Sequence, residues 1–92
     1  MAERRVAVAD PDGLHARPAA LFVKAAAAVG VPVKIGKAGT DDRVDARSIL
    51  AVLALDVRHG DEVVLSADGD GAEAALDQLA TLLSGAESDA VV

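Results

Sequence analysis

Four short runs of alternating apolar and polar residues predict β-strands at 4–9, 31–36, 43–45 and 62–67. Alternation with a period of two places successive side chains on opposite faces of a sheet. Turn residues separate the runs: Asp-Pro-Asp-Gly at 10–13, a polar segment with a glycine at 37–42, and Asp-Gly-Asp-Gly at 68–71. Lys34 and Glu62 alternate with apolar neighbours, so we expect one face of the sheet to be exposed to water.

Two longer segments have the hydrophobic spacing of amphipathic helices. In residues 16–29, apolar side chains recur every three or four positions, which predicts one buried stripe anchored by Phe22. The residues of this stripe are Pro18, Phe22, Ala25 and Val29. The last helix is expected to begin at residue 70 with a sequence close to a capping box, and to end at residue 85. Its predicted buried residues are Ala72, Ala75, Leu76, Leu79, Leu82 and Leu83.

Residues 48–55 are apolar at nearly every position, so the period alone does not distinguish a strand from a helix. Ser48 is suited to cap a helix and the segment contains alanines, which favours a short helix. The order βαββαβα predicts an α+β fold: a four-stranded antiparallel sheet with two long helices and one short helix on one face. We expect a single domain over residues 1–86, and a loose tail at 87–92, where no pattern is present.

Composition limits the classes of function. The chain has 92 residues, of which 52% are hydrophobic, and its net charge of −6 argues against binding to nucleic acid. There is no cysteine, so disulfides and thiolate metal sites are excluded. No apolar stretch is long enough for a signal peptide or a bilayer span, and we expect a cytoplasmic protein without membrane insertion.

The segment 13–20, Gly-Leu-His-Ala-Arg-Pro-Ala-Ala, lies where a predicted turn leads into a helix. Proline is tolerated in the first turn of a helix, so His15 is expected at or next to the N-cap. Free N–H groups and the helix dipole favour an anion there, and they favour the neutral, nucleophilic imidazole over the protonated one. Arg17 can clamp phosphoryl oxygens with two hydrogen bonds. In a plainer interpretation, both residues are solvated surface side chains.

This segment and a second one, Val-Asp-Ala-Arg-Ser-Ile-Leu at 44–50, resemble motifs of HPr, the histidine-containing phosphocarrier of the sugar phosphotransferase system. The length, the element order and the spacing of the two motifs are similar over essentially the whole chain. The resemblance implies an HPr-like open-faced sandwich. It also implies a phosphoryl carrier and not an enzyme, with no cofactor and no metal ion.

By this resemblance, His15 accepts a phosphoryl group from phosphorylated enzyme I, which is itself charged by phosphoenolpyruvate. The product is a pros-phosphohistidine, with phosphorus on Nδ1. The group then passes to a histidine on an enzyme IIA domain of a sugar permease. Arg17 and the backbone N–H groups of Ala16 and Arg17 stabilise the phosphoryl group. Partners dock on Ala20, Arg47, Ile49, Leu50 and Leu53, and the carrier is expected to be a monomer.

Ser48 has two interpretations. It is an ordinary N-cap, or it is a regulatory phosphoserine, as the matching serine is in HPr of some Gram-positive bacteria. The second interpretation adds an HPr kinase or a transcriptional regulator to the partners. The apolar residues after Ser48 are core residues or a docking patch, and we expect Leu50 and Leu53 to be divided between these roles. His59 and the carboxylates of Asp41, Asp42 and Asp45 are expected to be solvated loop groups.

Two positions depart from the HPr pattern: Asp12, where a small polar residue is usual, and Asp56, where a glycine commonly follows the short helix. A carboxylate at position 12 would stabilise a protonated His15 and repel a phosphoryl dianion. Asp56 implies a differently shaped end of the helix. Two other functions stay open: a nitrogen-branch phosphocarrier with the same chemistry, and a regulatory HPr-like binding module without phosphoryl relay. His15 disfavours the second, because such regulators lack the reactive histidine.

Overall fold

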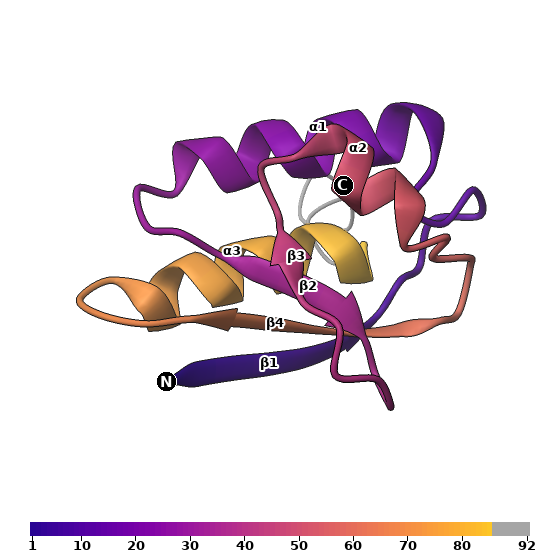
Figure 1. The fold of residues 1–92 in the computed structure, drawn as a ribbon. Helices are drawn as coiled ribbons and strands as arrows, with labels where there is room; N and C mark the ends of the chain where they lie inside the picture. The colour runs from indigo at the N-terminus through magenta and orange to yellow at the C-terminus, as the bar shows by residue number, and fades with distance from the viewer. Residues whose placement is uncertain (86–92) are drawn as a thin grey trace.

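The computed structural model describes residues 1–85, so the tail expected at 87–92 lies outside the described residues. The elements follow the predicted order βαββαβα (Figure 1). The strands are β1 (Ala2–Ala7), β2 (Lys34–Lys37), β3 (Val44–Asp45) and β4 (Glu62–Ala67). The helices are α1 (Ala16–Ala28), α2 (Ile49–Ala54) and α3 (Ala72–Ser84). The ambiguous apolar segment is therefore a short helix.

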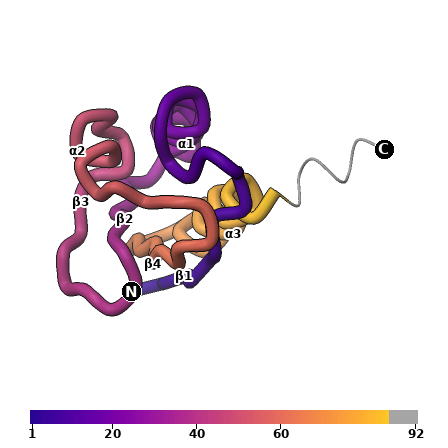
Figure 2. The backbone as a smooth tube through the Cα atoms, turned by 90° about the vertical axis from the view of Figure 1, so that its right-hand side faces the viewer, coloured from indigo at the N-terminus to yellow at the C-terminus, as the bar shows by residue number. Residues whose placement is uncertain are grey.

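The four strands form one antiparallel sheet in the order β1-β4-β2-β3. The central strand β4 pairs with β1 along its whole length, and with β2 in a register that sets Ile35 opposite Leu65. The three helices cover one face of this sheet (Figures 1 and 2). Ile35, Val63 and Leu65 are fully buried. Lys34 and Glu62 are exposed, as the alternating pattern predicts. The fold is the predicted open-faced sandwich.

The helices bury a slightly different set of side chains from the predicted one. The buried residues of α1 are Ala19, Phe22 and Ala26. Phe22 is the predicted anchor and is fully buried, whereas the other members of the predicted stripe are half-buried. The reason is that α1 contacts both α2 and α3. Its most buried side chains therefore point between these two helices. In α3, the predicted stripe is buried except at Leu82, which is half-buried.

The bounds of β1 and β2 differ from the predicted ones, and the hydrogen bonds of the backbone explain the differences. β1 spans residues 2–7 instead of 4–9, because Ala2 and Glu3 already pair with β4, and because the N–H groups of Val8 and Ala9 donate to residues beyond the β4 strand. Their acceptors are the carbonyls of Asp61 and Leu83, each at 3.0 Å. β2 begins three residues later than predicted. Pro32 has no N–H to donate to a strand ladder, which disfavours pairing at the start of the predicted run.

The caps of α2 and α3 agree with the sequence prediction at some positions and differ at others. Ser48 caps α2 as predicted, since its Oγ accepts the N–H of Ala51 at 3.3 Å. α3 begins two residues later than predicted, because Gly71 is the N-cap in a left-handed conformation with φ of 85° and has no side chain to cap the helix. Glu73, expected in a capping box, instead pairs with Arg4 of β1. Gly85 ends α3 as predicted.

Candidate functional site

His15 lies at the N-cap of α1, where the sequence predicts it. Its backbone is extended, with φ of −126° and ψ of 162°, and its side chain makes no capping hydrogen bond. The imidazole is 39% exposed, so a partner can reach it. The first turn of α1 contains no acidic residue, so no carboxylate in that turn offsets the positive end of the helix dipole.

The loop that carries His15 is attached to the segment that follows α2. Gly13 is buried with φ of 66°, and a Cβ there would lie 2.3 Å from the carbonyl oxygen of Val57. The same oxygen accepts the N–H of Leu14 at 2.9 Å. His59, expected as a solvated loop residue, is exposed, but its Nδ1 also lies 3.2 Å from the carbonyl oxygen of Asp10. These contacts fix the position from which His15 projects.

Ala16 and Arg17 follow His15 in the first turn of α1. Ala16 has a positive φ of 50°, which is unfavourable for a residue with a Cβ. Strained residues of this kind concentrate at functional sites. Arg17 is exposed, and its guanidinium makes no ion pair or hydrogen bond with any other residue of 1–85. A cation is therefore available to an anionic ligand beside His15.

Asp56 supplies a carboxylate to His15, a contact that the sequence does not reveal. Its Oδ1 lies 3.2 Å from Nε2 of His15, and its Oδ2 lies 3.2 Å from Nη2 of Arg58. The sequence predicts that Asp12 is the carboxylate near His15. Asp12 is instead exposed, its N–H donates to Oδ1 of Asp10 at 2.9 Å, and it forms no ion pair with His15. The signal in the sequence is Asp56 itself, at a position where the resemblance noted above implies a glycine.

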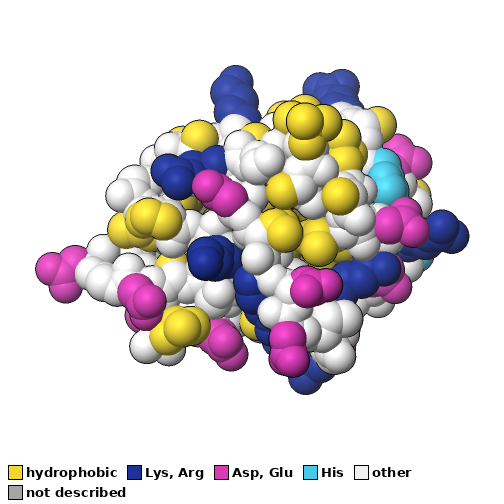
Figure 3. All heavy atoms as spheres, viewed as in Figure 1, with side chains coloured by type: hydrophobic (Ala, Val, Ile, Leu, Met, Phe, Trp, Pro, Cys, Tyr) yellow, Lys and Arg dark blue, Asp and Glu magenta, His cyan; other side chains and the backbone are white. Residues whose placement is uncertain are grey.

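The predicted docking residues are largely exposed. Leu50 is 77% exposed and Ile49 is 38% exposed, whereas Leu53 packs partly against the core. Ala20 is exposed on α1, the helix that α2 contacts. Hydrophobic side chains gather over α2 on the face shown in Figure 3. Leu21 of α1 is also exposed, at 48%, but it lies beside Leu82 of α3. Leu50 therefore lies on the surface and Leu53 lies partly against the core, which is the division expected from the sequence.

Arg47, a predicted docking residue, is held by Asp45. Its Nε and Nη2 each lie 3.2 Å from a carboxylate oxygen of Asp45, and its backbone N–H donates to Oδ1 at 2.9 Å. The hydrogen bonds from the Arg47 side chain and backbone hold the pKa of the Asp45 carboxyl below its usual range. Asp45 was expected to be a solvated hairpin group. It is exposed but paired, and it orders the segment that leads into α2.

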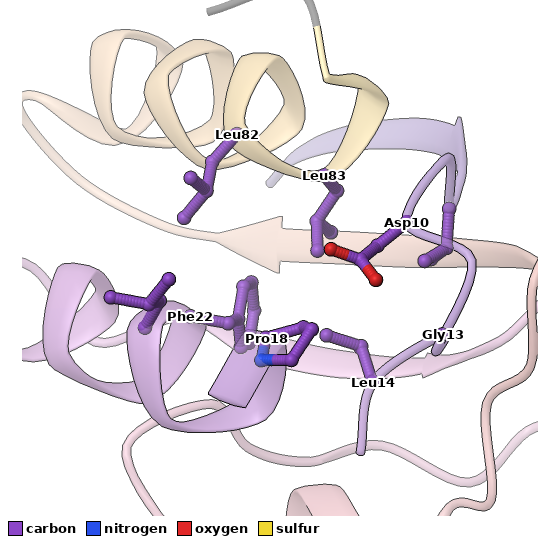
Figure 4. A pocket seen from close by; sticks show the side chains of 9 residues that line it. Asp10, Gly13, Leu14, Pro18, Phe22, Leu82 and Leu83 are labelled. Atoms are coloured by element: carbon purple, nitrogen blue, oxygen red, sulfur yellow. The ribbon is translucent and has the colours of Figure 1, made fainter. Parts of the chain in front are cut away.

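A cavity of about 70 Å³ lies beside the loop that carries His15 (Figure 4). Apolar side chains of α1 and α3 form most of its walls, and Asp10 is the charged residue among those that line it. A space of this size and polarity does not suit a phosphoryl group. Within residues 1–85, no cluster of three or more His, Cys, Asp or Glu side chains is arranged to hold a metal ion. None of the helices described there is long and apolar enough to cross a membrane.

Comparisons with known proteins agree on one family. The family model described as the PTS HPr component phosphorylation site, PTS being the phosphotransferase system, matches residues 2–85. The phosphocarrier protein HPr of Streptomyces coelicolor is 57% identical over 84 residues, which cover 91% of this chain and 89% of that protein. The HPr of Haloferax volcanii is 51% identical over 86 residues, covering 94% and 97%.

A solved structure supports the same assignment. The crystal structure of HPr from Bacillus anthracis superposes with a TM-score of 0.82 at 36% identity, covering 89% of this chain and 95% of that one. The chain belongs to the HPr family, whose members are phosphocarriers of the phosphotransferase system and not enzymes.

Proposed function

We propose that His15 accepts a phosphoryl group from phosphorylated enzyme I and passes it to an enzyme IIA domain of a sugar permease. One observation carries this proposal: a partly exposed imidazole stands at the uncapped N-terminus of α1, followed two residues later by an arginine without an ion-pair partner in residues 1–85. Phosphoryl transfer requires little from a protein beyond a positioned nucleophile and stabilisation of charge, and these residues provide both.

The transfer is a direct displacement at phosphorus. The lone pair on Nδ1 of His15 forms a bond to phosphorus, while the bond between phosphorus and the donor group of enzyme I breaks and its electron pair returns to that donor group. Arg17 and the backbone N–H groups of Ala16 and Arg17 offset the charge on the phosphoryl oxygens. Donation to enzyme IIA is the same step in reverse. The 39% exposure of the imidazole suits a carrier, which must release the group as readily as it accepts it.

Partners would dock on the surface of Ala20, Arg47, Ile49, Leu50 and Leu53. Exposed apolar side chains bordered by polar ones are typical of protein interfaces. Ser48 lies between two of these residues, so a phosphate added there by an HPr kinase would place a dianion within this surface. We expect a cytoplasmic carrier, and a monomer would leave this face uncovered for each partner in turn.

Intact mass after incubation with phosphoenolpyruvate and enzyme I tests the proposal. We expect an acid-labile gain of one phosphoryl group in the native protein and in H59A, which removes another exposed histidine. H15A should show no gain. A gain that persists in H15A would contradict the assignment of His15. No gain in the native protein, with enzyme I shown to be active, would favour the regulatory binding module.

A further inference from the structure

The carboxylate of Asp56 engages one of the two ring nitrogens of His15. Its Oδ1 is 3.2 Å from Nε2, and both side chains are partly exposed, at 54% for Asp56 and 39% for His15. The second carboxylate oxygen is 3.2 Å from Nη2 of Arg58. Nδ1 of His15 makes no hydrogen bond within residues 1–85. The two nitrogens of the ring therefore lie in different environments.

The backbone on both sides holds this contact in place. Asp56 adopts a left-handed conformation with φ of 54°, and its N–H donates to the carbonyl of Leu53 at 3.1 Å, which closes the end of α2. The next residue, Val57, is fully buried, and its carbonyl accepts the N–H of Leu14, the residue before His15. The neighbours of the pair, Leu14 before His15 and Val57 after Asp56, are thus joined by a backbone hydrogen bond. Backbone hydrogen bonds on both sides therefore hold the two short side chains of Asp56 and His15 next to each other.

We propose that Asp56 is a positioning residue for phosphoryl transfer, an inference that rests on the proposed function of His15. An ionised carboxylate 3.2 Å from Nε2 attracts a proton on that nitrogen and repels a lone pair there, so neutral His15 favours the form with its proton on Nε2. The lone pair is then on Nδ1. Partner groups of this kind fix both the tautomer and the orientation of an imidazole. Asp56 thereby selects the nitrogen that attacks phosphorus.

The same carboxylate stabilises the product of the transfer. As Nδ1 bonds to phosphorus and the bond between phosphorus and the donor group breaks, the proton of His15 stays on Nε2 and the ring becomes positively charged. Asp56 stabilises that charge, as the orienting carboxylate does for the imidazolium of a Ser-His-Asp triad. Arg58 offsets part of the negative charge of Asp56, which limits repulsion of the phosphoryl oxygens. The carboxylate can therefore assist the reaction without excluding its anionic substrate.

Ring ¹⁵N chemical shifts of His15 test the inference in the unphosphorylated protein, at alkaline pH where the ring is neutral. D56G removes the carboxylate but keeps the left-handed turn, since glycine adopts positive φ without strain. In the native protein, we expect the Nε2–H form to dominate almost completely. In D56G, the fraction of the Nδ1–H form should rise several-fold. D12N, which removes a carboxylate from the same loop without touching His15, should leave the spectrum unchanged.

Transfer rates provide the second readout. Phosphorylation of D56G by enzyme I should be roughly threefold to tenfold slower, because a half-exposed carboxylate stabilises the charge on the ring by only part of what it would contribute if buried. D56N retains an acceptor oxygen without the charge and should lie between the native protein and D56G. An unchanged ring spectrum or an unchanged rate in folded D56G would overturn the role of Asp56. A native protein that active enzyme I cannot phosphorylate would overturn the proposed function itself, whatever the ring spectra show.

Discussion

Gly13 lies so close to Val57 that a Cβ at position 13 would be 2.3 Å from the Val57 carbonyl oxygen. The same oxygen accepts the N–H of Leu14 at 2.9 Å, so a side chain at position 13 would displace the bond that anchors the loop before His15. The φ of 66° at Gly13 adds a second reason for glycine. The glycine of the motif is thus required by the contact between the His15 loop and the segment after α2.

Gly13→Ala should lower the free energy of unfolding by about 2–4 kcal/mol, the sum of a strained backbone and a close contact with a carbonyl. Denaturant unfolding measures this. Gly39→Ala is the matched control, because Gly39 also has a positive φ, of 87°, but open space where its Cβ would lie. It should cost only about 1–2 kcal/mol. Equal losses in the two variants would contradict the contact with Val57.

Arg17→Ala should slow phosphoryl transfer both to and from His15 by roughly tenfold, because a positioned cation stabilises the charge of the transferring group. The fold should be unaffected, since Arg17 is exposed and has no partner within residues 1–85. Rapid-quench assays with enzyme I and with an enzyme IIA domain measure the two directions. Lys24→Ala removes another exposed cation of α1 and should leave both rates unchanged. An unchanged rate of phosphoryl transfer in Arg17→Ala would contradict the proposed role of Arg17 in binding the phosphoryl oxygens.

Leu50→Glu should raise the KM for enzyme I at least about fivefold, the effect of losing an interface contact worth more than 1 kcal/mol. Stability should change by less than about 0.5 kcal/mol, because Leu50 is 77% exposed. Val52→Ala, on the same helix but fully buried, should show the reverse: a loss of about 1–3 kcal/mol of stability and an unchanged KM. A lower melting temperature with unimpaired transfer in Leu50→Glu would assign Leu50 to the core.

The features predicted from the sequence are those with a local cause. His15 at the start of α1, Ser48 at the cap of α2 and Phe22 in the core all follow from the spacing of apolar residues or from the chemistry of caps and turns. The contacts that were missed join distant segments. Asp56 reaches His15 only because α2 ends in a left-handed turn beside the His15 loop, and Glu73 leaves its expected capping role because the fold places Arg4 next to it.

The turn after the Asp56–Arg58 segment is stabilised by a carboxylate. Oδ2 of Asp61 accepts the backbone N–H of Arg58 at 2.9 Å and lies 3.6 Å from Nζ of Lys37. The hydrogen bond from the Arg58 backbone, together with the Lys37 charge, lowers the pKa of Asp61 from its ordinary value of 3.8. A group whose pKa is lower in the folded state contributes stability above its unfolded pKa, and this contribution is lost as the pH falls through the folded value.

Asp61→Asn should therefore be less stable than the native protein at pH 7, where Asp61 is ionised. The difference should shrink as the pH falls below about 4, because a protonated Asp61 resembles the amide that replaces it. Thermal melts between pH 7 and pH 2.5 measure the two curves. Asp41→Asn changes an exposed carboxylate in the loop between β2 and β3, and it should run parallel to the native protein over this range. A stability difference in Asp61→Asn that stays constant down to pH 2.5 would mean that the hydrogen bond to Arg58 does not depend on the charge of Asp61.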